Sequence, residues 1–131
     1  MEIMKPPHVS HIEWCCTNLS RSEQFYGQLF GWHFKRHGQR YSLYTPEHGP
    51  GPCVGLMLTD RVEASQTCHA FIEVTDIRSS LNQALALMSH IVVDATHIPD
   101  YGQYAQITDP DTNLVGLFQD NIPPTTDKPH C

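Results

Sequence analysis

The stretch HIEWCCTNLSRS at residues 11–22 is matched by HAFIEVTDIRSS at residues 69–80. The two segments share their first histidine, a threonine and the final serine, and they place leucine against isoleucine and asparagine against aspartate. The offset between them is 58 residues, from 69 − 11. Each copy starts as a strand-like run and continues into a helix-like one. Because self-similarity at a fixed spacing marks a duplicated structural unit, the repeat predicts two related halves.

The first half is expected to contain four strands and one helix. A capping box formed by Ser20 and Glu23 predicts the start of the helix, and Gly31 predicts its end. The proline- and glycine-rich run at residues 46–52 predicts a turn before the last strand. The strands are predicted at residues 9–17, 32–36, 40–45 and 53–58.

The second half repeats this order. Its helix is expected to bury one face that carries Leu81, Leu85 and Met88. Two turn-forming runs, at residues 99–102 and 109–111, separate the later strands. The strands are predicted at residues 68–75, 90–95, 103–108 and 114–119.

These elements predict an α+β fold, with two βαβββ modules forming paired, curved mixed sheets around a shared pocket. One module alone would leave a sheet face bare, and pockets between related halves commonly hold ligands. The 131 residues suit a single domain. Its expected parts are a first module at residues 8–58, a link at 59–67, a second module at 68–119 and an extended tail at 120–131.

Composition restricts the partners. The formal net charge is −6, and the eight lysines and arginines form no cluster, which argues against nucleic acid. No apolar run is long enough for a membrane span, and the first residues lack the pattern of a secretion signal, so the expected location is the cytoplasm. The five cysteines form an odd set without a Cys-x-x-Cys spacing and are expected to be reduced thiols.

Several short motifs resemble one known superfamily. The chain carries HIE at residues 11–13, FYG at 25–27, LFGW at 29–32, and DPD at 109–111 followed by NLVGLFQ at 113–119. Over about residues 8–119 the pattern resembles the vicinal oxygen chelate superfamily, which includes glyoxalase, bleomycin-resistance proteins and extradiol dioxygenases. The subgroup it is most similar to is described only as glyoxalase-related.

The resemblance implies a possible metal position. In metal-dependent relatives a cation is held by one residue from the first strand and one from the last strand of each module. His11 and His69 match the two histidine ligands. The two carboxylate positions fall at Gly55 or Leu56 and at Gly116, and none of these side chains can coordinate a metal. One divalent ion, whether zinc, nickel, manganese or iron, is therefore expected only in an atypical site.

Spacing in the first strand offers another ligand set. Glu13 follows His11 by two residues, so both side chains leave the same strand face about 6.6 Å apart along the backbone. Cys15 shares that face. His11, Glu13 and His69 could thus form the two-histidine, one-carboxylate set typical of non-haem iron. Alternatively, both histidines are hydrogen-bonding pocket residues and Glu13 is a pocket acid, with no metal bound.

Three functions are compatible with these residues, all with a small molecule as partner. The first is a glyoxalase-related lyase or isomerase, in which Glu13 or a histidine removes a proton next to a carbonyl. The second is a metal-free protein that sequesters a ligand, as bleomycin-resistance relatives do. The third, an extradiol-type dioxygenase, needs a carboxylate where Gly116 stands. The resemblance also implies a homodimer. Further ligand contacts are expected from Cys15, Phe71, Glu73, Tyr101 and Tyr104.

Overall fold

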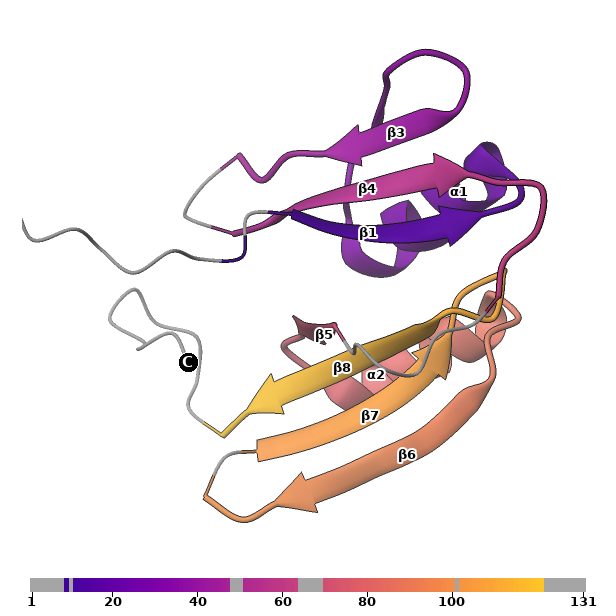
Figure 1. The fold of residues 1–131 in the computed structure, drawn as a ribbon. Helices are drawn as coiled ribbons and strands as arrows, with labels where there is room; N and C mark the ends of the chain where they lie inside the picture. The colour runs from indigo at the N-terminus through magenta and orange to yellow at the C-terminus, as the bar shows by residue number, and fades with distance from the viewer. Residues whose placement is uncertain (1–8, 10, 48–50, 64–69, 101, 122–131) are drawn as a thin grey trace, which may run out of the picture.

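Two βαβββ modules follow one another along the chain, each with a helix behind its own four-stranded mixed sheet (Figure 1). The computed structural model describes residues 9, 11–47, 51–63, 70–100 and 102–121. The first module contains β1 (His11–Cys16), α1 (Leu19–Phe30), β2 (Lys35–Arg36), β3 (Tyr41–Tyr44) and β4 (Cys53–Leu58). The second contains β5 (Phe71–Glu73), α2 (Ile77–Ala86), β6 (Ile91–Ile98), β7 (Gly102–Thr108) and β8 (Leu114–Asp120).

Strand register confirms that the modules are duplicates. The strand orders are β1-β4-β3-β2 and β5-β8-β7-β6, and in each sheet the first strand runs parallel to the last. Glu13 lies opposite Gly55, and Phe71 lies opposite Gly116. Phe71 follows Glu13 by 71 − 13 = 58 residues, the offset of the sequence repeat. Gly55 and Gly116 therefore occupy equivalent positions in the two sheets.

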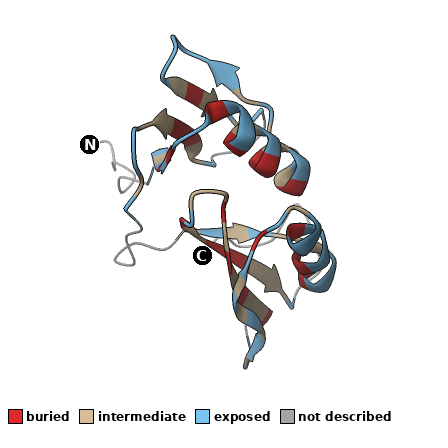
Figure 2. Cartoon of the chain, turned by 90° about the vertical axis from the view of Figure 1, so that its right-hand side faces the viewer, coloured by how far each residue is buried: buried red, intermediate tan, exposed pale blue. Residues whose placement is uncertain are grey.

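Each sheet buries one face against its helix and leaves the other, here called the open face, uncovered by its own helix. Along β1, Trp14 and Cys16 are buried, whereas His11, Glu13 and Cys15 are exposed, as the two-residue period of a strand requires. The buried residues of each helix face its sheet (Figure 2).

A single aromatic side chain lies at the centre of the first module. Tyr26 of α1 is fully buried and stacks on Trp14 at 5.2 Å and on Trp32 at 5.9 Å between ring centroids. Aromatic pairs at such distances contribute beyond the area that they bury. The aromatic face of α1 therefore forms part of the core.

The start of the first helix differs from the sequence prediction. Asn18, not Ser20, caps α1, since its side chain accepts a hydrogen bond from the backbone N–H of Arg21 at 3.0 Å. The expected end at Gly31 is confirmed, with the left-handed φ of 74° that favours glycine.

The apolar face predicted for the second helix is buried only at Leu81. Ile77, Leu81 and Ala84 are the residues that α2 buries. Leu85 is 50% exposed, and Met88 lies beyond the helix end and is 86% exposed. Neither described helix combines the length and the apolarity that a bilayer crossing requires.

The turn before β8 binds the second module to the first. Asp111 accepts hydrogen bonds from the backbone N–H of Thr17 at 3.0 Å and from its hydroxyl at 2.5 Å. Arg21 of α1 donates to the same carboxylate at 3.0 Å. The Asp111 side chain is only 5% exposed, whereas that of Arg21 is 46% exposed, so a nearly buried carboxylate meets donors at the surface.

A second set of bonds crosses the same boundary. Asp109 accepts a hydrogen bond from the Tyr26 hydroxyl at 2.9 Å, and the Asn113 side-chain amide donates to the carbonyl of Cys15 at 2.7 Å. Tyr26 and Cys15 belong to the first module, whereas Asp109 and Asn113 belong to the second. The motif at residues 109–113 therefore fixes how the two modules sit together.

Replacing Asp111 with alanine tests this role. Asp111→Ala should lower the free energy of unfolding by about 2 kcal/mol, because Thr17 and Arg21 lose the charged carboxylate that accepts their hydrogen bonds. Urea denaturation followed by circular dichroism measures the change. Asp60→Ala, which removes a fully exposed carboxylate, is the matched control and should change stability by no more than about 0.5 kcal/mol. Equal losses in the two variants would show that the inter-module bonds contribute nothing specific.

Candidate functional site

The open face of the first sheet carries a polar cluster on β1. The Nε2 atom of His11 lies 3.4 Å from Oε1 of Glu13, and the two side chains are 42% and 38% exposed. Cys15, two residues further along, is also exposed. The structure therefore brings His11 and Glu13 together on the face that their spacing predicts, within reach of a ligand from solvent.

Tyr41 completes this cluster from β3. Its hydroxyl lies 2.9 Å from Nε2 of His11, and the two rings are nearly parallel, with centroids 6.4 Å apart. A Cβ atom on Gly55 would overlap the Tyr41 hydroxyl and lie 3.0 Å from Nε2 of His11. The missing side chain at Gly55 is what lets Tyr41 reach across β4 to β1.

Sequence reasoning missed Tyr41. It lies 30 residues from His11 in the chain, on a strand that is not the neighbour of β1. One signal could have indicated it. Leu43 stands directly opposite Gly55, and Tyr41 is two residues away on the same face. A long side chain there is a diagonal neighbour of a bare glycine, and diagonal neighbours come into contact when one of them is aromatic.

The phenol of Tyr41 stays protonated at neutral pH. Partial burial is the largest effect that raises the pKa of Tyr41, and the hydrogen bond and the charge of Glu13 raise it further. Both effects disfavour a second negative charge beside the carboxylate. The hydroxyl therefore acts as a hydrogen-bond donor within the cluster.

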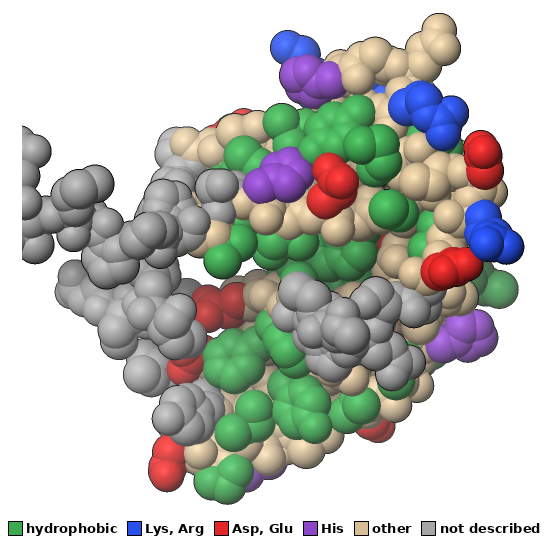
Figure 3. All heavy atoms as spheres, viewed as in Figure 1, with side chains coloured by type: hydrophobic (Ala, Val, Ile, Leu, Met, Phe, Trp, Pro, Cys, Tyr) green, Lys and Arg blue, Asp and Glu red, His purple; other side chains and the backbone are tan. Residues whose placement is uncertain are grey.

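The open face of the second sheet carries an aromatic pair instead. Phe71 of β5 and Tyr104 of β7 meet edge to face, with ring centroids 6.3 Å apart. Phe71 is 48% exposed. A Cβ atom on Gly116 would overlap the Phe71 ring, so this ring lies directly over the glycine. Hydrophobic side chains gather over this sheet, whereas a histidine and an acid stand side by side on the first (Figure 3).

Three other predicted site residues are not brought into these clusters by the described structure. Glu73 follows Phe71 by two residues and lines a different hollow, beside Ile72 and Asp76. His69 and Tyr101 lie outside the described residues. Their predicted roles stay predictions.

The described residues do not fit a carboxylate-held metal centre. The register assigns the first carboxylate position to Gly55, while Leu56 is fully buried on the helix-facing side. The space that side chains would need at Gly55 and Gly116 is filled by Tyr41 and Phe71. Within the described ranges, no three His, Cys, Asp or Glu side chains group closely enough to hold a metal ion. A metal site is normally built from three or four such ligands.

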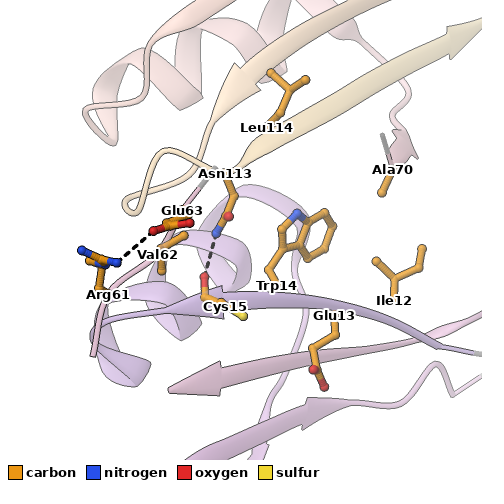
Figure 4. A pocket seen from close by; sticks show the side chains of 10 residues that line it. All are labelled: Ile12, Glu13, Trp14, Cys15, Arg61, Val62, Glu63, Ala70, Asn113 and Leu114. Carbon is orange, nitrogen blue, oxygen red and sulfur yellow. Dashed lines mark hydrogen bonds and ion pairs between the residues drawn. The ribbon is translucent and has the colours of Figure 1, made fainter. Parts of the chain in front are cut away.

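Two pockets of about 270 Å³ each lie between the modules, and His11 lines neither. In the first, Ile12 and Trp14 face Ala70 and Leu114 across the gap, and Glu13 also lines it but directs its carboxylate away (Figure 4). Arg61 and Glu63 form an ion pair of 2.9 Å at its rim.

The second pocket is apolar. Its lining includes Trp32, Tyr44 and Phe71, so one ring of the aromatic pair on the second sheet borders this space as well. Such mostly apolar concavities are typical places for small organic molecules.

Solved structures share this fold at low sequence identity. The fosfomycin resistance protein FosX from Listeria monocytogenes is 14% identical with a TM-score of 0.73, covering 90% of this chain and 97% of that one. An antibiotic-binding protein, TnmS3, from Streptomyces sp. CB03234 is 17% identical with a TM-score of 0.66, covering 91% and 100%. A lactoylglutathione lyase from Agrobacterium tumefaciens is 17% identical with a TM-score of 0.64, covering 88% and 96%.

These likenesses establish the fold alone. A search of curated proteins gave no match. The family model for the glyoxalase/bleomycin resistance protein/dioxygenase superfamily matches residues 8–117, which is most of the chain. The two modules, their register and this match lead to one conclusion: the chain belongs to the glyoxalase/bleomycin resistance protein/dioxygenase superfamily.

Proposed function

We propose that this chain binds a small organic molecule on the open faces of its sheets, without the carboxylate-held metal of its metal-dependent relatives. One observation carries the proposal. Both equivalent positions, Gly55 and Gly116, lack a side chain, and an aromatic ring occupies the space beside each. A carboxylate could not enter either place without displacing Tyr41 or Phe71.

The chemistry of the two faces suits an organic ligand. Phe71 and Tyr104 offer ring faces and edges for stacking, and aromatic contacts of this kind add to the free energy of binding. His11, Glu13 and Tyr41 offer the few polar groups that orient a bound molecule. The similarity to an antibiotic-binding protein is in keeping with this function.

A second candidate is a lyase or isomerase with Glu13 as general base. The specific observation in its favour is the 3.4 Å contact between His11 and Glu13, because a histidine beside a carboxylate can orient it and share its proton. An extradiol-type dioxygenase is less well supported, since Phe71 covers Gly116 where that chemistry needs a carboxylate.

We further propose a cytoplasmic homodimer. The three cysteines within the described ranges, Cys15, Cys16 and Cys53, are free thiols, which accords with a reducing compartment. The outer strand β6 presents an unpaired edge, with Val92 53% exposed, and sheet edges of this kind favour pairing with a second chain. Light scattering that gave the mass of one chain would exclude the dimer.

Metal analysis and thermal shift together test the binding function. Protein purified without chelators should contain far less than one zinc, nickel, manganese or iron per chain, and added divalent metals should leave its melting temperature unchanged. An aromatic or cationic ligand at about one hundred times its Kd should stabilise the fold by about 2.7 kcal/mol. One tightly held metal per chain would contradict the proposal, as would stabilisation by metals alone.

The packing of Phe71 over Gly116 can be tested by a double-mutant cycle. Gly116→Ala should lower the free energy of unfolding by about 1–3 kcal/mol, because the new methyl group collides with the ring. The Phe71→Ala/Gly116→Ala double variant should recover most of that loss, measured against Phe71→Ala alone. Additive losses would show that the ring does not occupy this space in solution.

The lyase or isomerase function has its own test. On an identified substrate, Glu13→Gln should lower turnover by about a hundredfold or more, since the amide cannot accept the proton. Glu47→Gln, at an exposed glutamate elsewhere on the surface, should leave turnover unchanged. Full activity of Glu13→Gln would exclude Glu13 as the base.

A further inference from the structure

Protons on the facing atoms of the polar cluster point at other members of the cluster. The phenol of Tyr41 can donate to Nε2 of His11, at 2.9 Å, or to the carboxylate of Glu13. When Nε2 instead carries the proton, it faces Oε1 of Glu13 at 3.4 Å. In either arrangement each hydrogen on these facing atoms points at another member of the cluster. What remains for a ligand is acceptor capacity, namely carboxylate and phenol lone pairs.

Among the described strand residues of the same face, none next to the cluster carries a positive charge. The register places Leu43, Cys53 and Met57 next to the cluster on the open face. The nearest lysine along the sheet, Lys35, stands opposite Leu43 on β2, three strand spacings from β1 or about 14 Å. The chain as a whole carries a formal charge of −6. The field at the cluster therefore favours a cation.

Tyr41 controls this preference. By donating to Nε2 of His11, it makes that nitrogen an acceptor, and the proton of the neutral imidazole then lies on Nδ1. Without the hydroxyl, Nε2 would carry the proton more often and offer it beside Glu13, which would weaken the acceptor bias of the face. Gly55 is part of the arrangement, because any side chain there would displace the phenol.

We propose that His11, Glu13 and Tyr41 form an acceptor subsite for an ammonium or guanidinium group of the ligand, with Tyr41 as its specificity residue. The inference rests on the proposed small-molecule binding function and names the class of ligand. The exposure of His11 and Glu13, 42% and 38%, lets such a group approach from solvent. Carboxylate bonds to a charged donor are roughly twice as strong as neutral ones.

Three matched probes test the subsite: benzylammonium, benzyl alcohol and benzoate, which share a phenyl ring and differ in charge. Titrations followed by amide chemical shifts should move the signals of β1 and β4 around Glu13 and Gly55. Benzylammonium should bind there about tenfold more tightly than benzoate, a difference of about 1.4 kcal/mol. Benzyl alcohol should fall between them.

Variants then identify the residues responsible for the preference for benzylammonium over benzoate. Glu13→Gln should abolish it, and Tyr41→Phe should shrink it at least about threefold, since the imidazole is then free to donate. Both replacements keep the size of the side chain, and the amide spectrum reports whether the fold is intact. Glu47→Gln removes an exposed carboxylate elsewhere on the surface, so it should keep the full preference.

Several outcomes would contradict the proposed acceptor subsite. Equal binding of benzoate and benzylammonium at this face would do so, as would an undiminished preference in Tyr41→Phe. So would the absence of chemical-shift changes at this face at about 10 mM probe, a concentration well above a Kd of about 1 mM. Charge-independent binding confined to Phe71 and Tyr104 would also overturn it, while leaving small-molecule binding itself intact. Only the absence of any stabilising ligand in the broader thermal-shift screen would count against both.

Discussion

The buried carboxylates of one turn determine how the halves of this protein are arranged. The backbone N–H groups of Asp111 and Asn113 both donate to Oδ1 of Asp109 at 2.9 Å, so the turn is held in shape from within. The other oxygen, Oδ2, then receives the hydroxyl of Tyr26. Burial raises the pKa of Asp109, and the bonds from Asn113 and Tyr26 oppose that rise. A carboxylate in this environment is tolerated only with these partners in place. The orientation of the modules, and of their open faces, depends on it.

Alternation along β1 separates buried from exposed side chains within six residues. Trp14 and Cys16 pack into the core, and His11, Glu13 and Cys15 project from the open face. The order of the elements, the duplication and the shared face of His11 and Glu13 were predictable because they follow from local periods and from a repeat. Such features depend on residues close together in sequence. The resemblance to the family, rather than these local patterns, predicted that Gly116 stands at a metal-ligand position that it cannot fill.

Contacts between distant residues were not predictable. The Ser20 and Glu23 spacing matches a capping box, but Glu23 is engaged elsewhere, by Arg36 at 2.7 Å and by the hydroxyl of Ser42. Arg36 also donates to Ser20. These partners come from later strands, so a tertiary ion pair overrides the local signal and lowers the pKa of Glu23. Tyr41 was missed for the same physical reason, since its contact with His11 exists only after three strands have paired.

The two modules share a backbone plan and differ in what they place on it. Glu13 and Phe71 occupy equivalent positions, opposite equivalent glycines, yet one is a carboxylate and the other a phenyl ring. In each sheet the glycine admits an aromatic ring, which supports a histidine in the first and meets a second aromatic ring in the second. Duplication therefore supplies two similar surfaces, and divergence at one pair of positions makes one polar and the other apolar. A ligand that used both surfaces would itself be asymmetric, with a charged end and an aromatic end. The difference between the two surfaces thus limits the kinds of ligand that could use both more strongly than the shared fold does.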